Sequence, residues 1–204
     1  TGAGSVATNT AVGASALQAN STGANTTAIG YQAFYNNTVA SEGVAVGSQA
    51  GFSQTNPARN TAIGYQSLVN NTTGNNNAAL GWNSANSNST GSSNVAIGIQ
   101  ALYSNTTGSG NFAFGGTVPG SYNAALYANT TGGNNAAFAG SALAANTTGS
   151  SNSAFGVGAL TSNPTASNNT AVGYQAGYSS TTGGQNVAVG YGALFSNTTG
   201  QLNV

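Results

Sequence analysis

The chain has 204 residues and a formal net charge of zero, with one Arg (Arg59), one Glu (Glu42) and no Lys, Asp, His, Cys or Met beside 31 Gly, 30 Asn, 26 Thr and 24 Ser. This composition lacks the general bases, nucleophiles and clustered metal ligands on which most enzymes depend, so we expect no catalytic activity, no metal and no cofactor. A neutral chain with one cation offers no electrostatic attraction to nucleic acid, and no apolar run of about 18 residues is present that could span a membrane.

A tripeptide of Ala, a large apolar residue and Gly recurs along the whole chain. Its leading alanines are Ala11, Ala28, Ala45, Ala62, Ala79, Ala96, Ala113, Ala137, Ala154, Ala171 and Ala188. Successive copies are 17 residues apart, except that the step from Ala113 to Ala137 is 24 residues, which indicates a 7-residue insertion between Gly115 and Ala125. Ala139 replaces the Gly in one unit. We interpret residues 1–204 as one repetitive domain of about 11 units.

Each unit is too short for a helix pair and ends in a polar turn, most clearly in copies of Asn-Thr-Thr-Gly such as residues 105–108. Around each leading Ala, side chains alternate with the period of a strand, as in Thr61-Ala62-Ile63. The sequence therefore predicts an all-β fold, a parallel β-solenoid or β-roll of 17-residue coils. Equivalent residues would stack about 4.8 Å apart, so that 11 coils make a rod of roughly 50 Å.

The residue after the leading Ala is large and apolar in all 11 units, which predicts that it faces a core. The invariant leading Ala is expected to face a close neighbour that leaves space for a methyl group only. Two arrangements provide one: the opposite wall of the same coil, or two further chains around a common axis. Six residues after the leading Ala, a large apolar residue recurs at Leu17, Phe34, Leu68, Leu102, Leu143, Leu160 and Leu194, and Leu126 takes the same place after the insertion.

Polar columns follow the same period. Two residues before the leading Ala, an Asn recurs that is expected to bond to its copies or to cap the turn, at Asn9, Asn60, Asn77, Asn94, Asn111, Asn135, Asn152, Asn169, Asn186 and Asn203. Glu42 and Arg59 both lie three residues before a leading Ala and are 17 residues apart. We therefore expect them to form a structural ion pair between adjacent coils.

The motif Asn-x-Ala-(Val/Ile)-Gly, as in Asn94-Val95-Ala96-Ile97-Gly98 and Asn186-Val187-Ala188-Val189-Gly190, resembles the YadA-like head repeats of trimeric autotransporter adhesins. It is also similar to the repetitive shafts of bacteriophage tail-fibre-like proteins. The resemblance covers nearly the whole chain and implies a homotrimeric parallel β-roll at the cell surface, outside the cell or on a virion. The repeat is longer here and carries an additional Asn-Thr-Thr-Gly turn.

These features predict an extracellular structural fibre or adhesin shaft that presents a neutral Asn- and Thr-rich surface for attachment or filament formation. Its partners would be further copies, in a homotrimer or end to end, and a carbohydrate or other cell-surface ligand. The chain starts at Thr1 without Met and stops within a unit, so we expect it to be a mature segment or an excerpt of a longer protein. An alternative is a solenoid that binds ice or crystal surfaces through a Thr ladder at Thr72, Thr106, Thr130, Thr147 and Thr198.

Three groups of residues are candidates for contacts at the surface. An aromatic column three residues after the leading Ala would either bind sugars or cover the edge of the core or a subunit interface; it contains Tyr31, Tyr65, Trp82, Tyr174 and Tyr191. The insertion, Gly116 to Asn123, is either a contact loop or a tolerated surface extension. Eleven Asn-x-Ser/Thr sequons are candidate glycosylation sites, at Asn20, Asn25, Asn36, Asn70, Asn71, Asn88, Asn105, Asn129, Asn146, Asn168 and Asn197.

Overall fold

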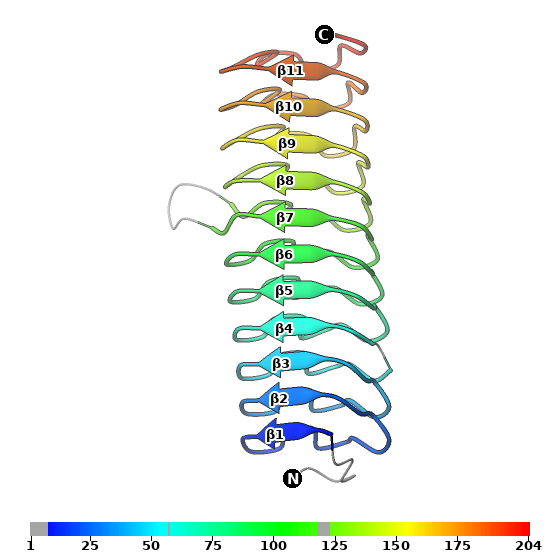
Figure 1. Cartoon of the computed structure of the whole chain (residues 1–204). Coiled ribbons are helices and arrows are strands. Elements are labelled where there is room, and N and C mark those ends of the chain that lie inside the picture. The colour runs from blue at the N-terminus through cyan, green and yellow to red at the C-terminus, as the bar shows by residue number, and fades with distance from the viewer. Residues whose placement is uncertain (1–7, 57, 118–122) are drawn as a thin grey trace.

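The computed structural model describes residues 8–56, 58–117 and 123–204, which wind into a rod of stacked coils with one short strand in each coil (Figure 1). No helix occurs in these described ranges. The strands are Thr10–Val12 (β1), Thr27–Ile29 (β2), Val44–Val46 (β3), Thr61–Ile63 (β4), Ala78–Leu80 (β5), Val95–Ile97 (β6), Phe112–Phe114 (β7), Ala136–Phe138 (β8), Ser153–Phe155 (β9), Thr170–Val172 (β10) and Val187–Val189 (β11).

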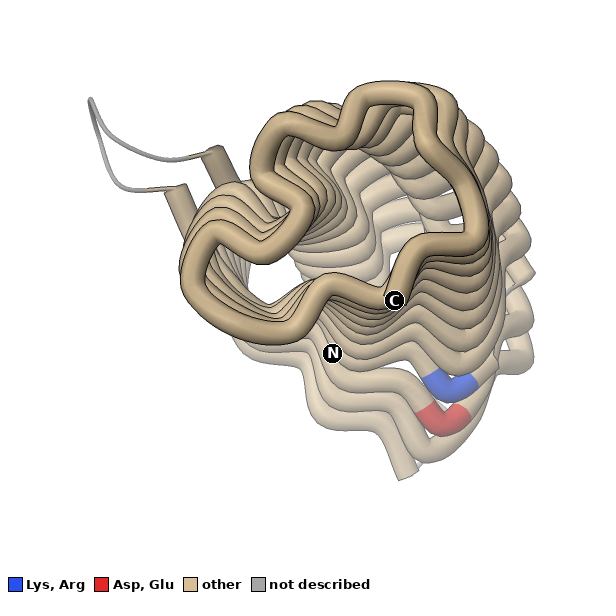
Figure 2. The backbone as a smooth tube through the Cα atoms, turned by 90° about the horizontal axis from the view of Figure 1, so that it is seen from above, with Lys and Arg blue, Asp and Glu red and all other residues tan. Residues whose placement is uncertain are grey.

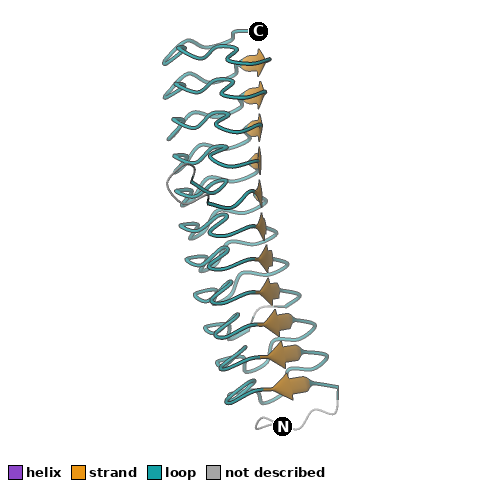
Figure 3. Cartoon of the chain, turned by 90° about the vertical axis from the view of Figure 1, so that its left-hand side faces the viewer, coloured by secondary structure: helices purple, strands orange, loops and turns teal. Residues whose placement is uncertain are grey.

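The strands form one parallel sheet in chain order, on one side of the rod (Figure 3). Ala62 lies opposite Ala79, so the register between neighbours is one 17-residue repeat. Across the insertion Ala113 pairs with Ala137, which restores the register. The predicted all-β solenoid of 17-residue coils is therefore confirmed. The strands run from right to left across the front of Figure 1 as the chain climbs, and the view from above in Figure 2 agrees, so the coil is left-handed.

The prediction of which strand residue faces the core was wrong. The leading Ala points inward and is fully buried in most coils, for example Ala62 and Ala79, while the large apolar residue after it lies on the outer face of the sheet. Ile63, for instance, is 38 % exposed. The physical reason is the width of the coil: the wall opposite the strand lies so close that a methyl group fills the space between them.

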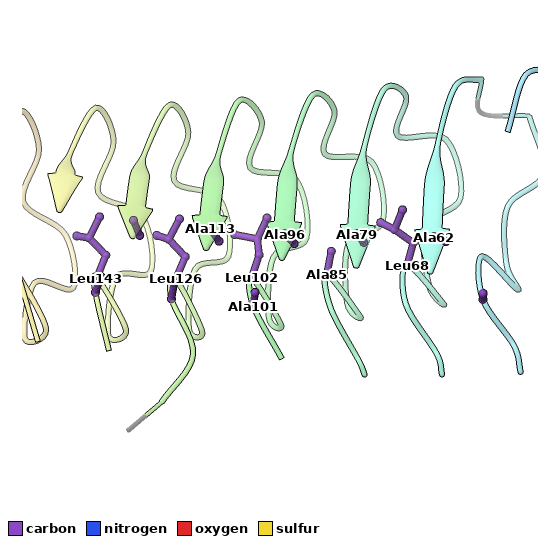
Figure 4. Packing of buried hydrophobic residues seen from close by; sticks show 14 of the residues in the cluster. Ala62, Leu68, Ala79, Ala85, Ala96, Ala101, Leu102, Ala113, Leu126 and Leu143 are labelled. Carbon is purple, nitrogen blue, oxygen red and sulfur yellow. The ribbon is translucent and has the colours of Figure 1, made fainter. Parts of the chain in front are cut away.

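That opposite wall supplies the close neighbour of the leading Ala, and it belongs to the same chain. Figure 4 shows Leu68, Leu102 and Leu126 reaching from the returning segment toward the strands. All three are fully buried, and their backbone has a left-handed φ of 48–55°. Such a φ costs a branched residue on the order of 1–3 kcal/mol, which the hydrogen bonds between coils and the burial of the side chain offset. Leu68 N, for example, donates to Ser84 O at 3.0 Å.

At two places a glycine takes the position of these leucines beside a large residue of the preceding coil. Phe34 takes the position of these leucines in its coil, and the next coil carries Gly51 there. A Cβ on Gly51 would overlap the Phe34 ring, and a Cβ on Gly177 would lie 2.9 Å from Leu160 Cδ2. The two glycines leave space for the larger side chain of the preceding coil, so a side chain of one coil fills part of the interior of the next.

The Gly that closes the Ala-x-Gly tripeptide is required by its backbone. Gly64 has a φ of +127°, and a Cβ there would lie 2.5 Å from Gly81 O on the next coil. The exception, Ala139, adopts a φ of +116°, which is unfavourable for an L-residue. The Gly column therefore permits the sharp turn after the strand and the close approach of successive turns.

Replacing Ala by Gly at one position of this column, and Gly by Ala at another, tests whether the turn requires Gly. We expect Ala139→Gly to raise the free energy of unfolding by about 1 kcal/mol, because it relieves backbone strain, and Gly64→Ala to lower it by more than about 2 kcal/mol, because of strain and overlap. Urea unfolding followed by circular dichroism measures both. The exposed Ala145, at an ordinary φ, is the control: Ala145→Gly should lose about 0.5–1 kcal/mol. A loss at Ala139→Gly similar to that control would contradict the interpretation.

Candidate functional site

The Asn column before each strand caps the turns, as predicted. Asn77 Oδ1 accepts the backbone N–H of Asn94 at 2.9 Å, one coil further on. Asn77 Nδ2 donates to Gly91 O, also at 2.9 Å. The same pair of bonds recurs in this column from Asn60 to Asn186, and these side chains are almost completely buried. This column therefore satisfies polar backbone groups inside the coil and has no amide to offer to a ligand.

The sequence analysis missed a second buried Asn ladder, in the Asn-Thr-Thr-Gly turn that it placed at the surface. Asn105 is fully buried; its Nδ2 donates to Asn88 Oδ1 at 2.7 Å and to Gly108 O at 2.9 Å. Asn129 Nδ2 donates in turn to Asn105 Oδ1 at 2.8 Å. The turn is at the surface, but its Asn points inward because the glycine carbonyl inside the turn needs a donor. The regular recurrence of Asn at this position was the available signal.

This ladder divides the candidate glycosylation sites into two groups. In four of them both Nδ2 hydrogens are donated, so the folded chain leaves none for a glycan to replace: Asn88, Asn105, Asn129 and Asn146. Asn20 and Asn71 donate one such bond and are buried, and Asn197 donates one and is half-buried. The others lie outside this ladder. Of these, Asn25, Asn70 and Asn168 are exposed and Asn36 is half-buried.

The outer face of the sheet carries an uninterrupted apolar column. Its members are the residues after each leading Ala: Val12, Ile29, Val46, Ile63, Leu80, Ile97, Phe114, Phe138, Phe155, Val172 and Val189. All are exposed or half-buried, and the rings of Phe114, Phe138 and Phe155 stack at 4.7 Å between centroids. We call this surface the outer apolar column. Contiguous apolar surface that runs the length of a protein marks an interaction face.

The predicted aromatic column is exposed, but the arrangement of its rings differs between the two ends of the rod. Tyr31, Tyr65 and Trp82 are 54 %, 46 % and 47 % exposed. Tyr174 and Tyr191 stack on each other with centroids 5.4 Å apart and an interplanar angle of 16°. In a stacked pair each ring covers one face of the other, so the two groups of rings differ in what they offer to a ligand.

Beside this column lie an amide ladder and a second aromatic column that the sequence analysis did not identify. One residue after the aromatic position, Gln49 Nε2 donates to Gln32 Oε1 at 3.1 Å and Gln66 Nε2 donates to Gln49 Oε1 at 2.8 Å. Three residues further along each coil, stacked ring pairs recur at Tyr35 and Phe52, Tyr103 and Tyr127, and Tyr178 and Phe195. Recurrence at seven residues after the leading Ala was the signal for this second column.

The threonines proposed for an ice-binding ladder have hydroxyls that are already engaged. Thr72 Oγ1 donates to Ser89 O at 3.0 Å, and Thr106, Thr130 and Thr147 make the equivalent bond at 2.9–3.1 Å. Thr198 is exposed. The threonines that follow them in each turn are exposed, but each is followed by a Gly and lies in a turn of the coil rather than in the sheet.

The two charged residues lie at the same place on adjacent coils (Figure 2). Arg59 Nε is 4.0 Å from Glu42 Oε2, and both side chains are largely exposed, so the pair contributes little to stability.

The described residues contain no group of three or more His, Cys, Asp or Glu that could hold a metal. No helix in the same ranges is long and apolar enough to cross a membrane. Most of the insertion, residues 118–122, lies outside the described residues.

No protein-family model, no curated protein and no solved structure matches this chain.

Removing one amide from the turn ladder tests how far it supports the rod. We expect Asn105→Ala to lower the free energy of unfolding by about 2–4 kcal/mol, because Asn88 Oδ1, Gly108 O and the Asn129 amide each lose a buried partner. The matched control is the exposed Asn70→Ala, for which we expect a change within about 0.5 kcal/mol. Urea titration measures both, and equal losses would show that the ladder is dispensable.

Proposed function

We propose that the chain is a non-catalytic structural rod, the shaft of an extracellular fibre or adhesin, and that three copies assemble through the outer apolar column. The observation that carries the proposal is this column of 11 apolar side chains on a face with no charged residue. A rod of stacked equivalent coils supplies length and a repeating surface rather than an enclosed pocket.

The geometry of the sheet supports closure of three chains around an axis. Each strand is three residues long, so the outer face is a wall only about 10 Å wide. A narrow apolar wall fits against two copies of itself, with the outer apolar columns meeting in the centre. The resemblance to trimeric adhesin heads points to the same number of chains. In this trimer the parallel rods bury the side chains that a single chain leaves in water.

A location outside the cell is proposed because of the chemistry of the remaining surface. Asn, Thr, Ser and Gln stay neutral over a wide range of pH, and their hydrogen bonds are not screened by salt. A rod whose surface carries one ion pair therefore keeps its properties where pH and ionic strength vary. Ice binding is the weaker candidate, since the Thr72 and Thr106 hydroxyls donate to backbone carbonyls instead of pointing outward.

A charge placed on the outer apolar column tests the assembly. We expect the native chain to have a solution mass three times its chain mass of 19.7 kDa, and Ile63→Glu to reduce this to the mass of one chain while the circular dichroism of the coil persists. A buried, unpaired carboxylate at the centre of the interface is the physical reason. Analytical ultracentrifugation measures the mass.

Thr73→Glu is the matched control, because Thr73 is exposed in the same coil but lies in the polar turn. It should leave the mass at three chains. A native mass of one chain would overturn the trimer, and an equal effect of both variants would remove the outer apolar column as its cause.

A further inference from the structure

The aromatic column is open in the N-terminal part of the rod. Tyr31 and Tyr65 occupy equivalent positions two coils apart, and the coil between them carries Ser48 there. With a coil spacing of about 4.8 Å, the backbone at the two tyrosines is separated by ~9.6 Å. Ser48 is small and half-buried, so this column has no aromatic ring between Tyr31 and Tyr65.

The separation suits one saturated ring held between two aromatic rings. Aromatic carbon and aliphatic C–H groups approach to about 3.5–4.0 Å at their optimum, and two such contacts nearly fill the space between Tyr31 and Tyr65. The pair Tyr174 and Tyr191 cannot do this, because its members sit on adjacent coils and stack directly at 5.4 Å. Trp82, 47 % exposed on the coil after Tyr65, extends the aromatic surface.

The amide ladder supplies polar contacts in the same coils. Gln32 and Gln66 directly follow the two tyrosines, and the bonds from Gln49 to Gln32 and from Gln66 to Gln49 orient all three amides. Each of these bonds uses one N–H of an NH₂ group and one lone pair of a carbonyl oxygen. The second N–H and the second lone pair of each amide remain for other partners. Aligned donors and acceptors of this kind match hydroxyl groups, which both donate and accept.

Charge narrows the class of ligand. Glu42 and Arg59 stand three residues before a leading Ala, whereas the aromatic position lies three residues after it, beyond the opposite end of the strand. No cation is therefore present near the tyrosines to compensate a carboxylate, sulfate or phosphate, and desolvating such a group there would cost free energy. The ligand that fits is uncharged, with C–H faces and many hydroxyls.

We propose that Tyr31, Tyr65 and Trp82, together with the Gln32, Gln49 and Gln66 amides, form a binding site for a neutral glycan, a hexose-based chain without acidic groups. This inference rests on the proposed role of the rod in attachment and names the ligand class of that role. Sugar rings contact the aromatic side chains through C–H groups, and their hydroxyls bond to the glutamine amides.

The test is affinity chromatography of the full chain on columns of immobilised polysaccharide, a method that does not depend on the charge of the protein. The neutral probes are a β-glucan, a galactomannan and a dextran, and the anionic probes are alginate and heparan sulfate. We expect retardation by at least one neutral polysaccharide and none by the anionic ones. Tyr65→Ala should weaken the retardation about tenfold or more, as expected for a central aromatic contact.

Two controls make the result specific. Tyr191→Ala removes a more exposed ring of the same column, 83 % exposed, and should leave retardation unchanged because that ring belongs to the stacked pair. Gln49→Ala interrupts the amide ladder and should weaken retardation without changing the solution mass. The site is overturned if no neutral polysaccharide retards the chain, if the anionic ones do so equally, or if Tyr191→Ala acts like Tyr65→Ala.

The result of the glycan-binding test can be distinguished from the result of the mass measurement that tests the trimer. Tyr65→Ala lies off the outer apolar column, so its mass in ultracentrifugation should equal that of the native chain. Retardation by a chain of monomeric mass would support the glycan site and reject the trimer. A trimer that no polysaccharide retards would support the rod and reject the glycan site.

Discussion

The rod depends on each coil completing the hydrogen bonds of its neighbour. Seventeen residues that return to their starting point must bend several times, and every bend turns backbone N–H and C=O groups toward the interior, where they need partners. Those partners come largely from one repeat away: Asn77 Oδ1 accepts the N–H of Asn94, and the Asn88 amide bonds to Asn71. Because a partner must recur in each coil, the same side chain must recur too, and this is the physical origin of the Asn columns.

The narrow interior has an equally direct consequence for the outside. With Leu68 and its equivalents filling the space from the opposite wall, the inward strand position takes Ala, and the bulk of each strand lies on the outer face. Stacking then turns a single exposed Ile into a column of 11 apolar residues. The feature that makes a thin coil possible is thus the same feature that gives it an apolar surface suited to partner chains. The proposed trimer follows from that surface.

Departures from the repeat show where the rod is adapted locally. Gly51 leaves space for the Phe34 ring of the preceding coil. Ala139 adopts a positive φ that the other members of its column adopt as Gly. On the surface, a residue that interrupts a column changes the spacing of the side chains on either side of it. Ser48 interrupts the aromatic column and leaves Tyr31 and Tyr65 two coils apart, whereas Tyr174 and Tyr191 on adjacent coils stack directly. Binding sites on a ladder protein are therefore to be sought where a ladder is incomplete.

The sequence alone determined the period, the parallel register and the position of the insertion, because a 17-residue repeat of strand and turn signals can be satisfied only by stacking. The pairing of Ala62 with Ala79 followed from that spacing. What the tertiary structure decided is which side of each element faces inward. Alternation places Ala62 and Ile63 on opposite faces without saying which is buried, and hydrophobicity favoured the wrong one. The sequence did not reveal the buried turn Asn or the stacked Tyr and Phe pairs for the same reason. Which side chains face the interior depends on the distance between the opposite walls of the coil. That distance is set only when the coil has closed.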